Sequence, residues 1–153
     1  GFVKVSDAVS QIWRSYKQDE PSSLEAGGIV LGRRIIETEN VILDTITSPM
    51  PSDRRGRTRF FRSMAGHQAR IEQAWQDSGG SVNYLGEWHT HPEADPTPSC
   101  IDKWDWKRLV RAAEYEGDEL FFFIVGIQTT KAWEVSKRRR KIVPLHQIAR
   151  PRP

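Results

Sequence analysis

Apolar residues are spread along the chain in short stretches, some spaced as on a helix face and others alternating or continuous as in strands. The first stretch has apolar side chains at intervals of three and four residues, which places them on one helical face: Val9, Ile12, Trp13 and Tyr16. Ser6 and Asp7 stand before it as a helix cap, and a break follows at 21–23. The pattern therefore predicts an N-terminal helix with one buried face.

The pattern also predicts a series of short strands. Two apolar segments, 26–36 and Val41–Ile46, would pair as a hairpin through 37–40. A polar loop over 48–58 then precedes a short strand at 59–61. Further strands are expected at 82–89, 120–127, 132–136 and 141–145.

Two more helices complete the pattern. One has His67, Ile71, Ala74 and Trp75 on a shared face and ends at Ser78-Gly79-Gly80. The other begins near Ser99, with an inner face formed by Trp106, Leu109, Val110 and Ala113. Trp88, Trp104 and Trp106 are expected to belong to the core or to a pocket wall. Because strands and helices interleave in short pieces, we expect an α/β or α+β fold, a sheet flanked by helices. The chain has the length of one domain, so residues 1–153 are expected to form a single domain.

Composition narrows the class of protein. Hydrophobic residues make up 37% of the chain and charged residues 28%, which is typical of a globular protein. No apolar run approaches the roughly 20 residues that span a bilayer, so no membrane segment is expected. Cys100 is the only cysteine, which excludes an internal disulfide and fits a cytoplasmic protein. We expect Cys100 itself to be a small residue of the core. Gly1 and Phe2 follow no signal pattern and suggest a processed start.

Positive charge is concentrated in two places, although the net charge is only +3. One cluster comprises Arg54, Arg55, Arg57 and Arg59, and the other is the run 137–141. Such clusters can bind nucleic acid or an acidic protein, but a solvated loop and a solvated strand end are the simpler interpretation. Nucleic-acid binding is not expected, because the clusters lack the interleaved aromatic residues of a single-strand binder.

The segment His89-Thr90-His91-Pro92, followed by Ser99 and Asp102, indicates metal chemistry. Side chains alternate along an extended strand, so two histidines separated by one residue point the same way. Asp102 follows a proline-rich turn that lets its carboxylate reach the same point. Three such ligands and one open position are typical of a catalytic zinc site, whose metal lowers the pKa of water toward about 7. Ser99 and Asp102 also fit a helix capping pair, and the two roles are compatible.

A zinc hydrolase also needs a general base and a donor for the oxyanion that develops on the scissile carbonyl. Ser99 lies between the histidines and Asp102, so its hydroxyl is a candidate for that donor. For the base there are three candidates: Glu25, Glu87 and Glu93. Glu87 would share the face of His89, and Glu25 begins an apolar segment where burying an acid needs a reason. Spacing alone leaves this choice open.

The segments Glu25-Ala-Gly-Gly-Ile-Val-Leu-Gly32, Gly86-Glu-Trp-His-Thr-His-Pro92 and Ser99-Cys-Ile-Asp102 together resemble the JAMM signature of the MPN (Mov34/PAD-1) domain family. The resemblance extends from about Val5 to Leu145. It implies a curved mixed sheet with flanking helices. It also implies that His89, His91 and Asp102 bind Zn²⁺, that Glu25 is the general base and that Ser99 stabilises the oxyanion.

Catalytic members of that family are zinc metalloproteases, and many cleave the isopeptide bond between the C-terminus of a ubiquitin-like protein and a lysine. The short form here is similar to bacterial members that accompany E1- and E2-like conjugation enzymes in anti-phage operons. It lacks the large insertion with which some eukaryotic relatives hold ubiquitin. The expected function is therefore a deconjugating isopeptidase, with a protein substrate and those enzymes as partners. Three alternatives remain: a peptidase that processes a sulfur-carrier or ubiquitin-like precursor, a non-catalytic scaffold, and a DNA-repair-linked role.

Overall fold

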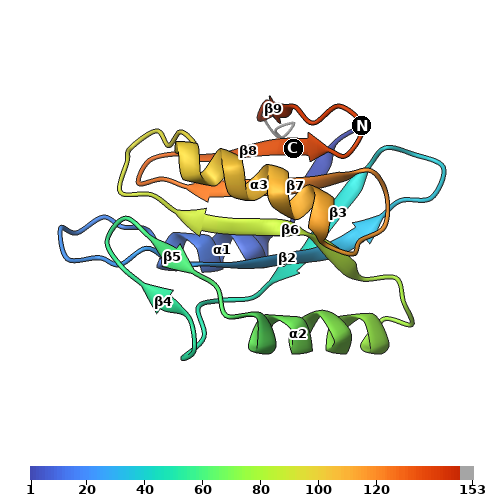
Figure 1. Cartoon of the computed structure of the whole chain (residues 1–153), viewed down its shortest axis with the longest axis horizontal. Coiled ribbons are helices and arrows are strands. Elements are labelled where there is room, and N and C mark those ends of the chain that lie inside the picture. The colour runs from blue at the N-terminus through green and yellow to red at the C-terminus, as the bar shows by residue number, and fades with distance from the viewer. Residues whose placement is uncertain (149–153) are drawn as a thin grey trace.

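The computed structural model describes residues 1–148 and has a central sheet of seven strands in the order β1-β3-β2-β6-β7-β8-β9 (Figure 1). These strands are β1 (Val3–Val5), β2 (Gly27–Arg34), β3 (Val41–Ile46), β6 (Asn83–Thr90), β7 (Glu119–Val125), β8 (Thr130–Ser136) and β9 (Ile142–Pro144). β1 with β3 and β6 with β7 are parallel pairs, and the other neighbours are antiparallel. The predicted mixed sheet of an α/β fold is confirmed.

Helices cover both faces of this sheet. They are α1 (Asp7–Ser15), α2 (Met64–Asp77) and α3 (Cys100–Ala112). α1 contributes Val9 and Trp13 to the core on one face, which Figure 1 shows behind the sheet. α3 contributes Trp106 and Val110 to the core on the other face, where Ile71 of α2 also packs. Within the described part of the chain, no helix is both long and apolar enough to cross a membrane.

A small two-stranded sheet stands beside the main one, which the sequence patterns only half predicted. β4 (Arg54–Arg55) lies inside the polar loop that was expected to be irregular, and it pairs with β5 (Phe60–Phe61). We refer to residues 54–61 as the β4–β5 hairpin. The base of the loop is closed by Asp53, whose carboxylate accepts the backbone N–H groups of Met50 at 2.7 Å and Ser63 at 2.7 Å. A two-residue ladder has no periodicity, so hydrophobic pattern could not reveal it.

His67, which the sequence pattern placed on the shared face of its helix, is a structural residue of the interior. Its ring is fully buried, with Nδ1 2.6 Å from the Thr47 hydroxyl and Nε2 2.8 Å from Asp53. The backbone carbonyl of Thr47 also accepts a hydrogen bond from the indole N–H of Trp88 at 2.8 Å. This buried network fixes the start of α2 and the loop before it against the sheet.

An extra residue in β6 decides which face of the sheet receives the histidines. Val30 of β2 pairs with Gly86 but Leu31 pairs with Tyr84, so Leu85 forms a β-bulge. A bulge shifts the alternation of side chains by one position. Before the bulge Tyr84 belongs to the α3-side core, and after it Trp88 belongs to the α1-side core.

The two faces are confirmed by ring contacts beyond the bulge. The rings of Trp88 and Tyr16, at the end of α1, have centroids 5.8 Å apart. The His89 ring is instead 6.4 Å from Trp106 of α3. A regular strand continuing from Tyr84 would have placed Trp88 under α3 and His89 under α1. The bulge therefore delivers His89 to the helix that carries Asp102.

Two residues expected in the core, and Trp104, expected in the core or a pocket wall, are exposed. Trp75 is 53% exposed and Trp104 is 65% exposed, and Cys100 also lies on the surface. On a helix with 100° per residue, Trp104 is about 200° away from the buried Trp106, which places it on the opposite side of α3. Cys100 begins α3 and lies about 240° from Trp106 by the same count. The core predictions for Trp75 and Cys100 were wrong, and Trp104 is not a core residue.

Candidate metal centre

Three side chains from two elements converge at the end of β6. The Nε2 atoms of His89 and His91 are 3.0 Å apart. The carboxylate of Asp102, from the first turn of α3, spans both rings: Oδ1 is 3.2 Å from His89 Nε2 and Oδ2 is 3.1 Å from His91 Nε2. The three side chains are largely shielded from solvent, at 11–15% exposure.

These distances can be compared with the requirements of a metal ion. Two ligand atoms on a tetrahedral zinc ion with bonds of about 2.0–2.1 Å lie roughly 3.3 Å apart. The three separations among His89, His91 and Asp102 are close to that value. Two imidazole nitrogens with one carboxylate are also a donor set that zinc prefers. The residues present therefore fit a metal ion of this type.

Asp102 is held in place by the start of its own helix. Ser99 is the N-cap of α3: its hydroxyl accepts the Asp102 N–H at 3.1 Å, and its own N–H donates to Asp102 Oδ2 at 2.8 Å. The expected capping pair is thus present, and it orients the carboxylate toward the histidines. A hydroxyl that accepts a bond still carries its own proton, so Ser99 keeps a donor beside the cluster.

Glu25 lies immediately before β2 and reaches the same cluster from another segment. It is 5% exposed, and it offers a carboxylate oxygen that, with one ring nitrogen each of His89 and His91, forms a group within 4.8 Å. Its Oε2 atom is buried and has no hydrogen-bond partner among the described residues. A buried carboxylate oxygen without a hydrogen-bond partner is costly unless a ligand completes it.

Burial and neighbouring charges shift the pKa values of the side chains in this cluster. Burial raises the pKa of Glu25 from 4.5 to about 7, although His89 and His91 act to lower it. Burial would also raise the pKa of Asp102, but its bonds to both histidines hold that pKa well below its usual range. Burial alone would lower the pKa of His91, yet Asp102 and Glu93 outweigh it and raise that pKa. Of the two carboxylates Glu25 and Asp102, Glu25 is therefore the one that can exchange a proton near neutral pH.

The other two carboxylates considered as the base occupy different positions. Glu93 lies behind His91, 2.7 Å from its Nδ1 atom, on the side of the ring away from Nε2. It fixes the tautomer in which Nε2 is free to face a metal. Glu87 forms an ion pair with Arg62, a partner that the sequence patterns did not suggest. Of the three, Glu25 is the one that joins the histidine cluster.

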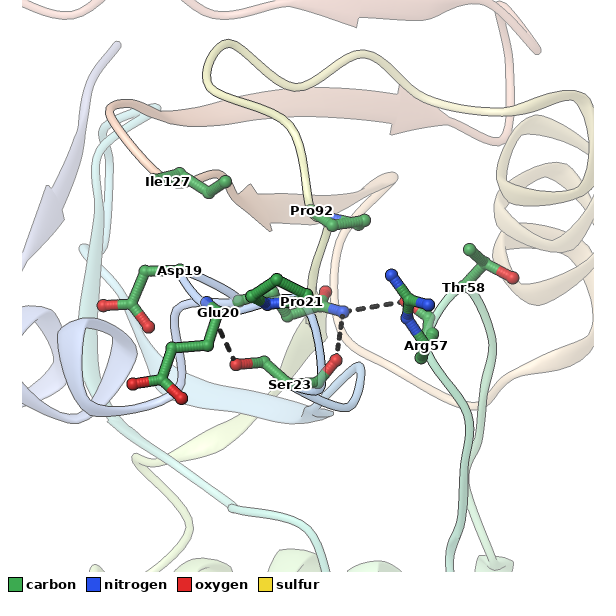
Figure 2. A pocket seen from close by; sticks show the side chains of 9 residues that line it. Asp19, Glu20, Pro21, Ser23, Arg57, Thr58, Pro92 and Ile127 are labelled. Atoms are coloured by element: carbon green, nitrogen blue, oxygen red, sulfur yellow. Dashed lines mark hydrogen bonds between the residues drawn. The ribbon is translucent and has the colours of Figure 1, made fainter.

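An open groove begins beside Pro92, the residue that follows His91. Its volume is about 640 Å³. Figure 2 shows Asp19 and Glu20 on one side of it, Arg57 and Thr58 on the other, and Ile127 beyond Pro92. None of His89, His91, Asp102 and Glu25 lines this groove, so it lies apart from the cluster itself.

Comparisons with known proteins address the family and the fold. Residues 5–139 match a family model described as prokaryotic homologs of the JAB domain. Two proteins named "CD-NTase/cGAS isopeptidase", from Pseudomonas aeruginosa and Escherichia coli, are each 38% identical to the chain. The first match covers 71% of this chain and 67% of the relative, and the second covers 81% and 75%. A Vibrio cholerae protein of the same name is 33% identical, over 84% of this chain and 77% of its own.

Two solution structures share the architecture. A protein from Desulfitobacterium hafniense superposes with a TM-score of 0.64 at 18% identity, covering 96% of this chain and 92% of the other. One from Salinibacter ruber gives a TM-score of 0.56 at 21% identity, covering 98% and 92%. At such low identities these likenesses show the fold alone.

Proposed function

The chain belongs to the family of prokaryotic homologues of the JAB domain, and from that premise we propose that it is a zinc-dependent isopeptidase. The proposed reaction is hydrolysis of the amide between the C-terminal carboxyl group of one protein and a lysine side chain of another. The observation that carries the proposal is the convergence of His89, His91 and Asp102 at mutual distances of 3.0–3.2 Å, with Glu25 beside them.

His89, His91 and Asp102 would hold the metal. Zinc bound there supplies Lewis-acid polarisation and makes hydroxide available at neutral pH. Glu25 takes the proton of the attacking water and returns it to the leaving lysine amine, since its raised pKa of about 7 suits both transfers. Ser99 donates a hydrogen bond from its hydroxyl to the oxyanion that develops on the scissile carbonyl. The two reciprocal hydrogen bonds between Ser99 and Asp102 hold both side chains in position for these roles.

The substrate class follows from the names of the relatives. Three of them are called CD-NTase/cGAS isopeptidases. We therefore propose that the protein whose C-terminus is joined to the lysine is a CD-NTase, a protein of the cGAS class. E1- and E2-like enzymes that form such bonds are the proposed partners, in a bacterial anti-phage system.

The proposed function predicts that lysine-linked adducts in lysates of the native host disappear when the protein is added. Lysates lacking the protein are treated with wild-type enzyme, with wild-type enzyme plus a zinc chelator, or with Asp102→Asn. Mass spectrometry of branched peptides should show loss of adducts with the untreated wild type alone, because the other two lack a complete metal site.

The other possible results separate the alternatives. Shortened linear precursors with intact lysine adducts would replace the isopeptidase by a precursor-processing peptidase. Equal adduct levels in all samples, together with no zinc in the purified protein, would leave a scaffold.

Glu93 gives a second prediction about the same centre. Removing the carboxylate that holds His91 Nδ1 should weaken zinc binding about 10- to 100-fold, the usual effect of removing such a partner. Glu93→Ala is compared with Asp95→Ala, which removes a neighbouring exposed carboxylate bonded to Lys131 and Thr129. Zinc affinity is measured by competition with a chromophoric chelator. Equal affinities for the two variants would show that Glu93 does not orient the ligand.

A further inference from the structure

A polar side chain is almost completely buried behind the metal centre, and one end of it is attached to the strand of the histidines. Gln18, which follows α1, is 2% exposed, and its amide oxygen accepts a hydrogen bond from the Thr90 hydroxyl, with the two oxygens 2.8 Å apart. Thr90 stands between His89 and His91, so its fully buried side chain points to the opposite face of β6. The Gln18 amide therefore bonds to the strand directly behind the two histidines.

The other end of the amide holds the two segments that enclose Glu25. Its nitrogen donates to the carbonyl oxygens of Ser23 at 3.3 Å and Arg57 at 2.8 Å, bonds marked by dashed lines in Figure 2. Ser23 precedes Glu25 by two residues. Arg57 belongs to the β4–β5 hairpin and follows Gly56, whose carbonyl accepts the backbone N–H of Glu25 at 2.7 Å.

The backbone around Glu25 is thus fixed on both sides. Besides Gly56, the hairpin supplies Arg55, whose Nε donates to the Glu25 carbonyl at 3.0 Å. The next peptide N–H, that of Ala26, donates to the Thr90 hydroxyl at 2.9 Å. These bonds set the direction in which the Glu25 side chain leaves the backbone, and Gln18 connects the segments that make them.

We propose that Gln18 is a positioning residue for Glu25. It ties the strand of the histidines, the segment before β2 and the β4–β5 hairpin together, so that the Glu25 carboxylate stays in reach of His89 and His91. The proposal rests on the proposed function, in which Glu25 moves the proton. Proton transfer depends on that placement, since a displacement of about 1 Å can cost about a hundredfold in rate.

The kinetic test uses substitutions that preserve volume. Gln18→Met removes all three hydrogen bonds, and Gln73→Met makes the same change at an exposed position of α2. At a temperature where both are folded, we expect kcat of zinc-loaded Gln18→Met to fall about 10- to 100-fold. Its KM should change by less than about twofold, as a loss confined to the transition state requires. Gln73→Met should match the wild type in both constants.

Thr90 supplies a second pair of variants, which keeps the test open if Gln18→Met does not fold. Thr90→Val removes the hydroxyl at constant shape and should reproduce the loss of kcat. Thr90→Ser keeps the hydroxyl and should recover most of the rate. A role limited to stability would lower the melting temperature of these variants without this separation of kcat from KM.

Amide hydrogen exchange tests the same link without any activity. In the metal-free protein, peptides covering 24–27 and 54–61 should exchange at least about tenfold faster in Gln18→Met than in Gln73→Met, while β7 and β8 stay unchanged. Because this measurement needs no substrate, it decides the link even if the proposed function fails. Unchanged exchange in both segments, or a kcat equal to that of Gln73→Met, would overturn the proposal.

Discussion

Replacing Glu25 with glutamine should abolish isopeptide cleavage while the protein still binds zinc. Glutamine keeps the size of the side chain but cannot accept the proton of the attacking water or return it to the amine. General acid–base groups contribute about 100- to 10,000-fold, and Glu25 is proposed to act in both directions, so we expect a loss of about 1,000-fold or more in kcat. His89, His91 and Asp102 are unchanged, and zinc content should remain at one ion per chain. Both quantities are measured on the same preparation.

The same substitution should stabilise the metal-free protein at alkaline pH. The folded-state pKa of Glu25 is raised from 4.5 to about 7, so the contribution of this group to stability is fully present below pH 4.5 and is lost as pH rises from there through about 7. That shift corresponds to about 3 kcal/mol at pH 8, which glutamine would recover in large part because it never ionises. Thermal unfolding of chelator-treated wild type and Glu25→Gln should therefore agree near pH 4 and diverge by pH 8.

Glu72→Gln, at an exposed position of α2, is the matched control for both measurements. It should leave cleavage unchanged and shift unfolding by the same small amount at both pH values. If Glu25→Gln cleaved at more than about a tenth of the wild-type rate, the general base would have to be another group. If its stability failed to rise with pH relative to wild type, the carboxylate would not be buried as the structure shows.

The sequence patterns predicted which side chains form this site better than they predicted where the fold places them. The pattern His-x-His on an apolar strand correctly gave two imidazoles on one face, because alternation is a local property. Which face they occupy depends on the bulge at Leu85, and its only signal in the sequence is Gly86, a glycine inside an apolar strand. Glu25 is more than 60 positions away from the histidines in the chain, so spacing could not place it beside them, and its role rested on family resemblance.

Residues that support the site were harder still to predict. Gln18 and Thr90 carry no charge and match no motif, and their importance arises from contacts across 72 positions of sequence. Glu93 was noticed, but as a candidate base, because a carboxylate beside a histidine gives no indication of which ring nitrogen it will face. The exposed Trp104 shows how residue type alone can mislead. Tryptophan is usually buried, but the rotation of about 100° per residue along α3 places Trp104 on the side of the helix opposite the buried Trp106.

Substituting alanine for Gly86 should cause a large loss of stability, although it adds only one methyl group. Gly86 has φ = +145°, in a region that side chains rarely adopt. A Cβ atom there would lie 1.8 Å from the carbonyl oxygen of Phe121, which belongs to the neighbouring strand β7. Backbone cannot retreat as a flexible side chain can, so β6 would have to separate from β7 or lose its bulge. We expect a loss of about 3 kcal/mol or more.

For a chain of this length, that loss corresponds to a drop of roughly 10 °C in Tm. Gly79→Ala is the matched control, because Gly79 also has a positive φ, of +65°, but a Cβ there meets no atom within 4 Å. It should cost about 1 kcal/mol, the backbone strain alone. The fraction of Gly86→Ala that remains folded should also bind zinc more weakly than Gly79→Ala, because the bulge that turns His89 toward Asp102 is disturbed. If the two variants melted within about 2 °C of each other, β6 could not have the bulged backbone on which the whole metal centre depends.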